Sequence, residues 1–547
     1  MHVAWRLHPA DPRLADRLAR GLHIHPITAQ VLINRGVADQ AHAERFLNPA
    51  MASLDDPFRL PDMGRGVDRL RSAIARRETI LIFTDSDTDG LTAGAILYDV
   101  LRGLGAVVRA RSSNRRADGY GFPQAWIARL ARSATKLLIL VDCGTNQAQE
   151  IHRLRAVGID TIVIDHHVPL DGWATPHALI NPYRGGTIGR EFCSAGLALK
   201  VAHALLGGPA SAAAEDLLDL AALGTLADCS PLVGENRAIV VAGLPRLVRS
   251  HRPGVQRLCE QTGVMQPLPD HVIQRLIPRL NASGRLGDAS AIWRLLISRD
   301  EDPLDEWLEM GHQAHATTKQ LYRQLLGEAQ EQVSRLHFRD HAIMIVSGQG
   351  WHPGLMGPLA SQLAQRYGRP SIALAMDAHR GIGSGRSIPV FNLLEALRRC
   401  QGDLMRFGGH AQACGLTVER GRFESFRERI NQHAQAALGR DGLLKTRTAD
   451  VEVPLRAVEP QWVGELDRLA PFGQGNPRPT VILRRVTMQA VSARVARLSD
   501  GAVSLRGKGS CLDVVPEGRY DVLGSPTLAE GEVVLTVNDV RAAAAPS

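Results

Sequence analysis

The sequence is short of cysteine and has no long apolar run. Its seven cysteines are scattered over 547 residues without a CxxC pair, which argues against a disulfide framework and against a structural zinc site. No stretch approaches the ~20 apolar residues of a membrane-spanning helix, and residues 1–22 lack the apolar core of a signal peptide. We therefore expect a cytoplasmic protein with free thiols and no membrane partner.

Lysine is also scarce, although positive charge exceeds negative charge. Only five lysines occur and the formal net charge is +8, so nearly all of the excess is arginine; the pI is near 9.4. Such an excess indicates a polyanionic partner such as nucleic acid. A genomic bias towards arginine produces the same balance without one, so the charge indicates function only beside a suitable site.

The order of strand-like and helix-like segments divides the chain into four predicted domains. Residues 1–240 are predicted to form a polar, helical N-terminal extension followed by an α/β domain, in which buried strands alternate with helices around a parallel sheet. Residues 241–336 are predicted to form a helical connector, and residues 337–445 a second, smaller α/β domain. Residues 446–547 carry strand patterns with few helix signals, which predicts a small β-barrel.

Three predicted strands of the first domain end in acidic residues. The apolar runs at 80–83, 137–141 and 161–164 lead into Asp85-Ser86-Asp87-Thr88-Asp89-Gly90, Asp142 and Asp165-His166-His167. Because ligand sites form beyond the carboxyl ends of parallel strands, these side chains are predicted to share one crevice. Like charges crowded there repel unless cations bridge them. Carboxylates with imidazole suit Mn²⁺ and related ions.

The first acidic segment has two other interpretations. Its DxDxDG pattern also opens a calcium-binding EF-hand loop, but the twelfth loop position is Ile96 instead of a bidentate Glu, and a strand instead of a helix precedes it. A solvated acidic turn is the second interpretation. Two close divalent ions would instead activate a water and stabilise both oxygens of a phosphoryl displacement. The sequence contains no Walker loop that would compete with this chemistry.

These motifs, taken in order, resemble the DHH phosphoesterase superfamily and, within it, the RecJ exonucleases. The resemblance runs through nearly the whole chain. It rests on residues 85–90, Asn114-Arg115 with 118–121, Asp142-Cys143-Gly144, Asp165-His166-His167, 224–228 with 235–237, 278–285, 351–354, 383–387, 407–410 and 471–477. Each motif alone is weak, whereas the ordered series is specific. Thr84, Ser86 and Thr88 depart from the family's usual first motif without removing a carboxylate.

The resemblance implies a role for each site residue. Two divalent ions, Mn²⁺ in preference to Mg²⁺, would be held by Asp85, Asp87, Asp89, Asp142, His166 and Asp228. The catalytic residues would be His167, Asp142 and Asp87, with His167 beside the scissile phosphate. Contacts to the substrate would come from Asn114, Arg115, Tyr120, Arg279, Asn281, Arg285, Ser384, Arg386, Ser387 and His410. Arginine suits this work because its planar fork pairs two phosphate oxygens; a surface ion pair is the alternative for each arginine.

The activity that the resemblance implies is hydrolysis of single-stranded DNA from its 5′ end, in recombination and repair. An OB-like fold is implied for the barrel, and a helicase and a single-strand-binding protein are candidate partners of what we expect to be a monomer. Two alternatives stay open. One is a DHH phosphoesterase for short oligonucleotides or small phosphorylated nucleotides, against which the connector and barrel argue. The other is an inactive nucleic-acid-binding scaffold, against which the complete set of acids argues.

Overall fold

The computed structural model describes residues 3–115, 117, 119, 121–170, 172–186, 188–299, 302–337, 340–439, 446–513 and 515–543. The described residues form two compact units. The barrel unit lies within 1–53, 231–237 and 445–547, and the two-lobe unit within 54–230 and 238–444. Residues 1–53 thus group with the C-terminal segment, whereas the sequence placed them with the first α/β domain. No helix in these ranges combines the length and hydropathy that crossing a membrane requires.

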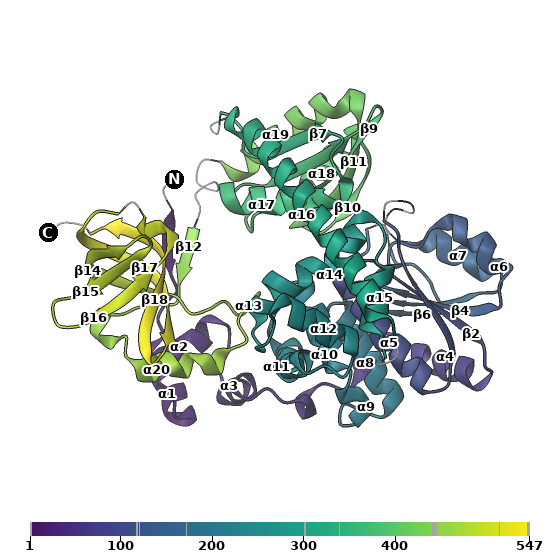
Figure 1. The fold of residues 1–547 in the computed structure, drawn as a ribbon, viewed down its shortest axis with the longest axis horizontal. Helices are drawn as coiled ribbons and strands as arrows, with labels where there is room; N and C mark the ends of the chain where they lie inside the picture. The colour runs from purple at the N-terminus through teal and green to yellow at the C-terminus, as the bar shows by residue number, and fades with distance from the viewer. Residues whose placement is uncertain are drawn as a thin grey trace. The chain divides into compact units, whose positions relative to one another are not determined.

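A five-stranded parallel sheet forms the first lobe of the two-lobe unit (Figure 1). Its strand order is β3-β2-β4-β5-β6. The strands are β2 (Thr79–Thr84), β3 (Val107–Ser112), β4 (Thr135–Val141), β5 (Asp160–Ile164) and β6 (Ala178–Ile180). The buried apolar runs predicted β2, β4 and β5, whereas β3 alternates exposed and half-buried residues and has no such run. The predicted parallel α/β fold is confirmed.

Helices cover both faces of this sheet (Figure 1). On one face, α6 (Ile127–Ala131) and α7 (Ala148–Ala156) share a core with the strands through apolar residues such as Leu138 and Leu154. The other face is covered by α4 (Met63–Ala75), α5 (Thr88–Gly103) and α8 (Ser194–Leu206), behind which lies α10 (Leu218–Ala227). Helices α5 and α8 therefore begin at the edge of the sheet where the acidic residues are.

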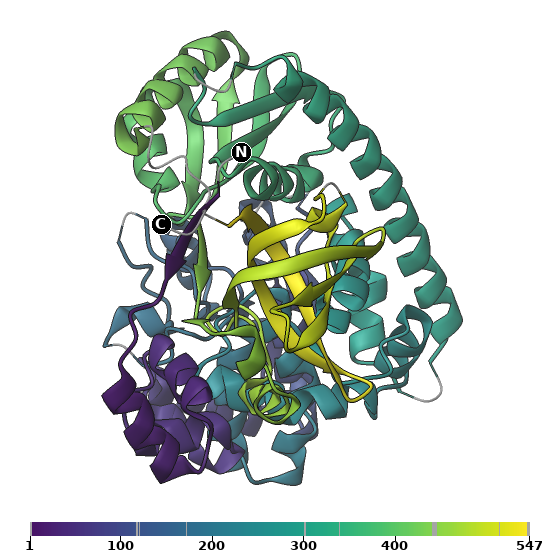
Figure 2. The same cartoon turned by 90° about the vertical axis from the view of Figure 1, so that its left-hand side faces the viewer.

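A helical connector leads to the second lobe. It contains α12 (Pro253–Thr262), α14 (Ile277–Leu286), α15 (Ser290–Leu296) and α16 (Leu304–Ser334). At 1.5 Å per residue, the 31 residues of α16 span about 46 Å, and Figure 2 shows this helix running up to the second lobe. The predicted helical connector is therefore present.

The second lobe is a smaller α/β layer. Its mixed sheet has the order β10-β11-β9-β8-β7, in which only β7 and β8 are parallel neighbours. The strands are β7 (Met344–Gln349), β8 (Ser371–Met376), β9 (Arg380–Arg386), β10 (Leu404–Gly409) and β11 (Ala413–Glu419). Helices α17 (Met356–Tyr367), α18 (Leu393–Arg399) and α19 (Phe423–Leu438) cover it.

The barrel unit is built around five strands. These are β14 (Val481–Ser492), β15 (Val495–Ser499), β16 (Ser504–Lys508), β17 (Gly518–Ala529) and β18 (Glu532–Ala542). Pairing of β14 with β17 closes the barrel, as predicted. The N-terminal strand β1 (Ala4–Leu7) pairs in parallel with β12 (Thr446–Ala449), and helices α1 (Pro12–Leu22), α2 (Pro26–Asn34) and α3 (Gln40–Leu47) share the barrel's apolar core.

Candidate metal centre and active site

The carboxyl ends of β2, β4 and β5 bring the predicted acids together. Among the described residues, three groups have ligand atoms within 4.8 Å of one another: Asp85, Asp87 and Asp142; Asp89, His166 and Asp228; and Asp142, His166 and His167. Asp142 and His166 each belong to two groups. This sharing is what two neighbouring cation sites with a bridging ligand require.

His166 lies among three carboxylates. Its Nε2 atom is 3.4 Å from Asp142 Oδ1, 3.8 Å from Asp89 Oδ2 and 4.0 Å from Asp228 Oδ1. Two of these separations are too long for direct hydrogen bonds. Imidazole with carboxylate oxygens is a donor set for first-row divalent metals.

The start of α8 supports two of these acids. The backbone N–H of Ser194 donates to Asp89 Oδ2 at 2.9 Å, and that of Ala195 to Asp89 Oδ1 at 2.8 Å. The Ser194 hydroxyl donates to Asp142 Oδ1 at 2.9 Å. The first amides of a helix have no partner within the helix and carry partial positive charge, so they orient carboxylates well. Neither residue was predicted, because nothing in an apolar helix start indicates a partner about a hundred residues earlier.

Three acids of the cluster ionise with difficulty. Desolvation, reinforced by neighbouring carboxylates, raises the pKa of Asp87 to about 7 and that of Asp89 to about 7. The same causes raise the pKa of Asp142 to about 6. Bound divalent cations would neutralise such a group and restore the ionised forms. The residues present therefore fit a two-cation centre.

His167 is held by the acid of its own motif. Its Nδ1 lies 2.7 Å from Asp165 Oδ1, which also accepts the His167 backbone N–H at 3.1 Å. Burial alone would lower the pKa of His167, but the Asp165 charge and hydrogen bond raise it to about 9. The ring stacks on His410, with centroids 5.7 Å apart. Asp165 was predicted at this edge without a role of its own, and its role is to position the neighbouring histidine.

Arginines gather beside Asp87. Arg115 Nη2 donates to Asp87 Oδ2 at 3.0 Å. Burial lowers the pKa of both Arg285 and Arg386, and the nearby Arg115 charge lowers each of them further. Arg115 therefore lies close to two other predicted phosphate-binding arginines. Arg115 is paired with Asp85 and Asp87, and the group as a whole suits an anionic ligand.

Ser384 lies next to this arginine group, on β9. A methyl group at Gly357 would lie 3.1 Å from Arg386 Nη2 and 3.8 Å from the Ser384 hydroxyl oxygen. The small residue at the start of α17 thus leaves room for both side chains. Contacts of Ser384 and Arg386 with phosphate stay predictions.

Asn281 supports the first acidic segment. Its Oδ1 accepts the Thr88 backbone N–H at 2.8 Å and the Thr88 hydroxyl at 2.7 Å. On the same helix, a methyl group at Gly284 would lie only 2.1 Å from the Ser86 carbonyl oxygen. Helix α14 therefore packs directly on the acidic segment, and Asn281 holds that segment instead of pointing its Oδ1 at a substrate.

The remaining predicted substrate residues make bonds within the protein. These are Arg279 Nη1 to the Gln261 carbonyl at 3.2 Å, the Ser387 hydroxyl to the Phe391 carbonyl at 2.7 Å, and Asn114 Oδ1 from the Ala117 N–H at 3.0 Å. Tyr120 lies outside the described residues. Contacts of these four residues with substrate stay predictions.

Comparisons with known proteins agree with this geometry. Three family models match in order: the N-terminal domain of the DHH family at residues 79–225, the DHHA1 domain at 340–436 and the RecJ OB domain at 449–513. The single-stranded-DNA-specific exonuclease RecJ of Bacillus subtilis is 32% identical over 546 residues, covering 96% of this chain and 69% of the relative.

Solved structures lead to the same family. The crystal structure of RecJ with Mn²⁺ from Thermus thermophilus matches with a TM-score of 0.85 and 27% identity, covering 100% of this chain and 80% of that one. The structure with Mg²⁺ matches with a TM-score of 0.78 and 26% identity, covering 100% and 79%. From the ordered motifs, the acidic centre and these matches, the chain belongs to the RecJ family of single-stranded-DNA-specific exonucleases.

Proposed function

We propose that this chain is a metal-dependent hydrolase that removes nucleotides from single-stranded DNA. The observation that carries the proposal is the meeting of acids and histidines from three strand ends and two helices, in three groups whose ligand atoms each lie within 4.8 Å of one another. Beside them lies an arginine group suited to phosphates. A metal centre next to an anion site supports phosphodiester hydrolysis.

The metal ions would be held by Asp87, Asp89, Asp142, His166 and Asp228. When bound, two such ions, Mn²⁺ or Mg²⁺, lower the pKa of a water and neutralise charge on the phosphate. Asp142 would serve both ions, since it shares one group with Asp87 and another with His166. Asp85, which was predicted as a further ligand, is paired with Arg115.

His167 would contact the scissile phosphate. Because Asp165 holds the ring through Nδ1, His167 would contact the phosphate through Nε2. His410, stacked against this ring, would limit its movement. Asp87 would hold its oxygen towards the attacking water, as its side chain is 40% exposed, in contrast to the 4% of Asp142.

The arginine group would bind the phosphates of the strand. Arg115, Arg285 and Arg386, with Ser384, would hold the 5′ end of the strand so that cleavage proceeds from 5′ to 3′. The polarity is taken from family resemblance, and the asymmetric position of the arginines, on the Asp87 side of the centre, supports one fixed strand direction.

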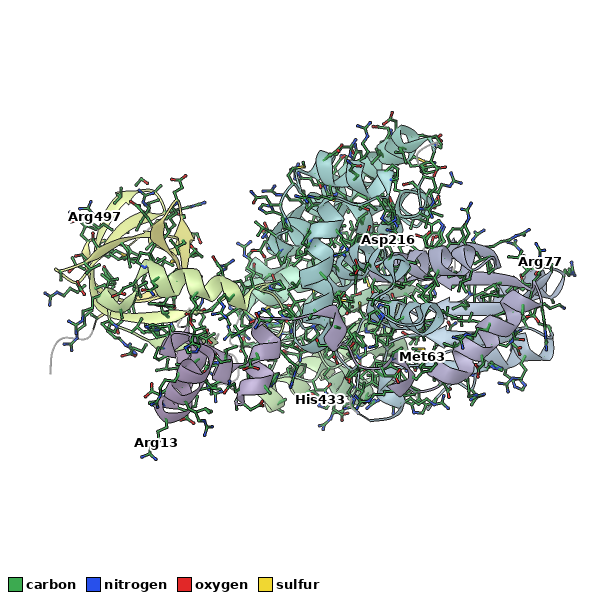
Figure 3. All side chains as sticks on the ribbon, turned by 90° about the horizontal axis from the view of Figure 1, so that it is seen from below. Arg13, Met63, Arg77, Asp216, His433 and Arg497 are labelled. Carbon is green, nitrogen blue, oxygen red and sulfur yellow. The ribbon has the colours of Figure 1, made fainter. Side chains whose placement is uncertain are left out.

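The barrel unit offers a second surface for DNA. Arg497 on β15 lies directly opposite Arg506 on β16, and both side chains are exposed, as is Lys508. Figure 3 shows Arg497 on the outside of the barrel. Like charges directly opposite on neighbouring strands are destabilising unless an anion lies across them. We propose that this face binds the DNA backbone, which would make affinity strongly dependent on salt.

The domain boundaries and cellular setting are proposed on the same basis. The predicted division at 240/241, 336/337 and 445/446 has a matched family inside three of its four parts, with residues 1–53 serving the barrel unit. We propose a monomeric, cytoplasmic enzyme of recombination and repair. A helicase and a single-strand-binding protein are the proposed partners, because unwinding produces the substrate and coating proteins cover it.

One set of digestions tests the activity. Long single strands and duplexes, each labelled at either end and with or without a 5′ phosphate, are incubated with Mn²⁺ or Mg²⁺, alongside dinucleotides. We expect mononucleotide release from the 5′ end of single strands, abolished in Asp142→Ala. Turnover of dinucleotides with inert long strands would favour the short-oligonucleotide phosphoesterase. Binding of DNA without release of nucleotides from any substrate would favour the inactive scaffold.

A further inference from the structure

We propose that Asp85 is a positioning residue that holds Arg115 towards the substrate phosphate, and that it is not a ligand of either metal ion. The proposal rests on the proposed function of the site and refines it. It differs from the family-based expectation that all three acids of the first segment hold metal.

Protein donors already bind both oxygens of Asp85. Its Oδ1 accepts the Ser86 backbone N–H at 2.8 Å, the Ser113 hydroxyl at 2.8 Å and Arg115 Nε at 2.9 Å. Its Oδ2 accepts Arg115 Nη2. A carboxylate has about four acceptor directions; three donors share Oδ1 of Asp85, and Arg115 binds Oδ2. A metal ion could reach only Oδ2, and there it would meet the positive charge of Arg115 beside a side chain that is 2% exposed.

Strand pairing builds this arrangement. In the β2–β3 register, Thr84 is the partner of Ser112, and the Ser113 N–H donates to the Thr84 carbonyl at 2.7 Å. Asp85 and Ser113 are therefore the first residues after two neighbouring strands. Arg115 follows two residues later and reaches the carboxylate through two of its nitrogens. A two-nitrogen contact fixes the plane of a guanidinium group as well as its position.

Asp87 is placed differently, although only one residue separates it from Asp85. Its side chain is 40% exposed, and its Oδ1 accepts the Gly90 N–H at 3.1 Å as the N-cap of α5. Its Oδ2 accepts Arg115 Nη2 at 3.0 Å. Asp87 therefore faces the centre, while Asp85 lies behind it. An ion bound by Asp87 would replace this last bond and release that N–H of Arg115 for a phosphate oxygen, while Asp85 keeps the guanidinium in place.

The same device occurs on the other side of the centre. Buried Asp165 holds His167 through Nδ1 and through the backbone N–H, just as buried Asp85 holds Arg115. Each acid directly follows a strand of the same sheet. Asp165 orients His167, two residues further along the chain. Asp85 orients Arg115, which follows the end of the neighbouring strand. The metal-facing acids Asp87, Asp89 and Asp142 would then lie between two oriented cations.

Mn²⁺ binding without DNA separates the two roles of the acids. Titration of the full chain with Mn²⁺, followed by electron paramagnetic resonance or calorimetry, is compared for wild type, Asp85→Asn and the matched variant Asp87→Asn. We expect Asp85→Asn to bind the same number of ions as wild type, with affinity changed less than about three-fold, and Asp87→Asn to lose one ion or at least about ten-fold in affinity. One fewer ion bound by Asp85→Asn would overturn the proposal.

Kinetics test the link to Arg115. For a strand with a 5′ phosphate, Asp85→Asn is expected to raise KM about ten-fold or more, and Arg115→Gln to do the same. The double variant should be no worse than Arg115→Gln alone, because both changes remove one contact. Losses that multiply in the double variant would contradict the link.

A second variant keeps the test valid if Asp85→Asn does not fold. Mn²⁺ binding is measured without DNA, so its result does not depend on nuclease activity. If Asp85→Asn does not fold, Arg115→Lys decides, since an ammonium group cannot span both Asp85 oxygens. It should bind Mn²⁺ like wild type and share the KM defect, and unchanged KM would overturn the proposal. Wild-type protein that binds two ions but degrades no DNA would refute the proposed function and leave the Mn²⁺ comparison valid.

Discussion

Replacing Asp142 by Asn should stabilise the metal-free protein at alkaline pH while abolishing activity. Asp142 is 3% exposed, and desolvation together with Asp89 raises its pKa from 3.8 to about 6. An acid whose pKa is raised in the folded state destabilises the fold above that pKa, and this penalty disappears as pH falls towards 3.8. A shift of about two units corresponds to about 3 kcal/mol above pH 7, and to about half of that at pH 5.

Asn is a suitable replacement for structural reasons. Asp142 has φ = 60°, a left-handed conformation that Asn tolerates well, and an amide oxygen can still accept the Ser194 hydroxyl. The assay is thermal unfolding of chelator-treated wild type and Asp142→Asn between pH 5 and pH 8. The stabilisation by Asn should grow by about 1.5 kcal/mol over this range, or about 2 °C for a unit of this size. The order should reverse with saturating Mn²⁺, which stabilises only protein that binds it.

Equal stability differences at pH 5 and pH 8 would refute this reasoning. The site would then hold its carboxylates ionised without cations, by some compensation that the described side chains do not provide. Stabilisation of Asp142→Asn by Mn²⁺ equal to that of wild type would separately refute the role of Asp142 as a ligand.

Three further substitutions test packing around the site and in the barrel unit. The Ser86 hydroxyl is buried without a partner among the described residues, so Ser86→Ala should stabilise the fold by about 1 kcal/mol and leave nucleotide release within about two-fold. Gly284→Ala would meet the Ser86 carbonyl at 2.1 Å and should lower kcat at least about ten-fold, whereas Gly64→Ala, with open space around it, should be neutral in the same assay. Arg237 donates to four backbone carbonyls at 2.6–3.1 Å, so Arg237→Met should lower the free energy of unfolding by about 4 kcal/mol. Arg494→Met removes only an exposed ion pair and should change it by less than about 1 kcal/mol.

The strand ends of the site were predictable because a buried strand appears in the sequence as a short run of apolar residues. An apolar run that stops at a charged residue indicates both a buried strand and its end, so Asp85, Asp142 and Asp165 could be placed at one edge of a parallel sheet. Residues that act through distant partners carry no such signal. Pairing of β1 with β12, which joins Ala4 to Thr446, depends on a match of edges that neither segment reveals alone. For this reason the sequence did not indicate that residues 1–53 group with the C-terminal segment.

The roles of individual acids were beyond the sequence for the same reason. Asp85 and Asp165 have lowered pKa values: burial opposes ionisation, but Arg115 outweighs it for Asp85 and His167 for Asp165. Asp87, Asp89 and Asp142 have raised pKa values, because desolvation and neighbouring carboxylates outweigh the nearby cationic groups.

The acids therefore divide into two sets, according to whether a cationic side chain of the protein already balances their negative charge. Acids already balanced by a protein cation have no electrostatic need of a metal ion, and they are free to orient the cation that balances them. Acids left unbalanced are those that a divalent ion must neutralise. Removal of Arg115 would therefore change the role of Asp85 even though every carboxylate of the motif is still present. Without a cation to balance it, Asp85 would compete for metal.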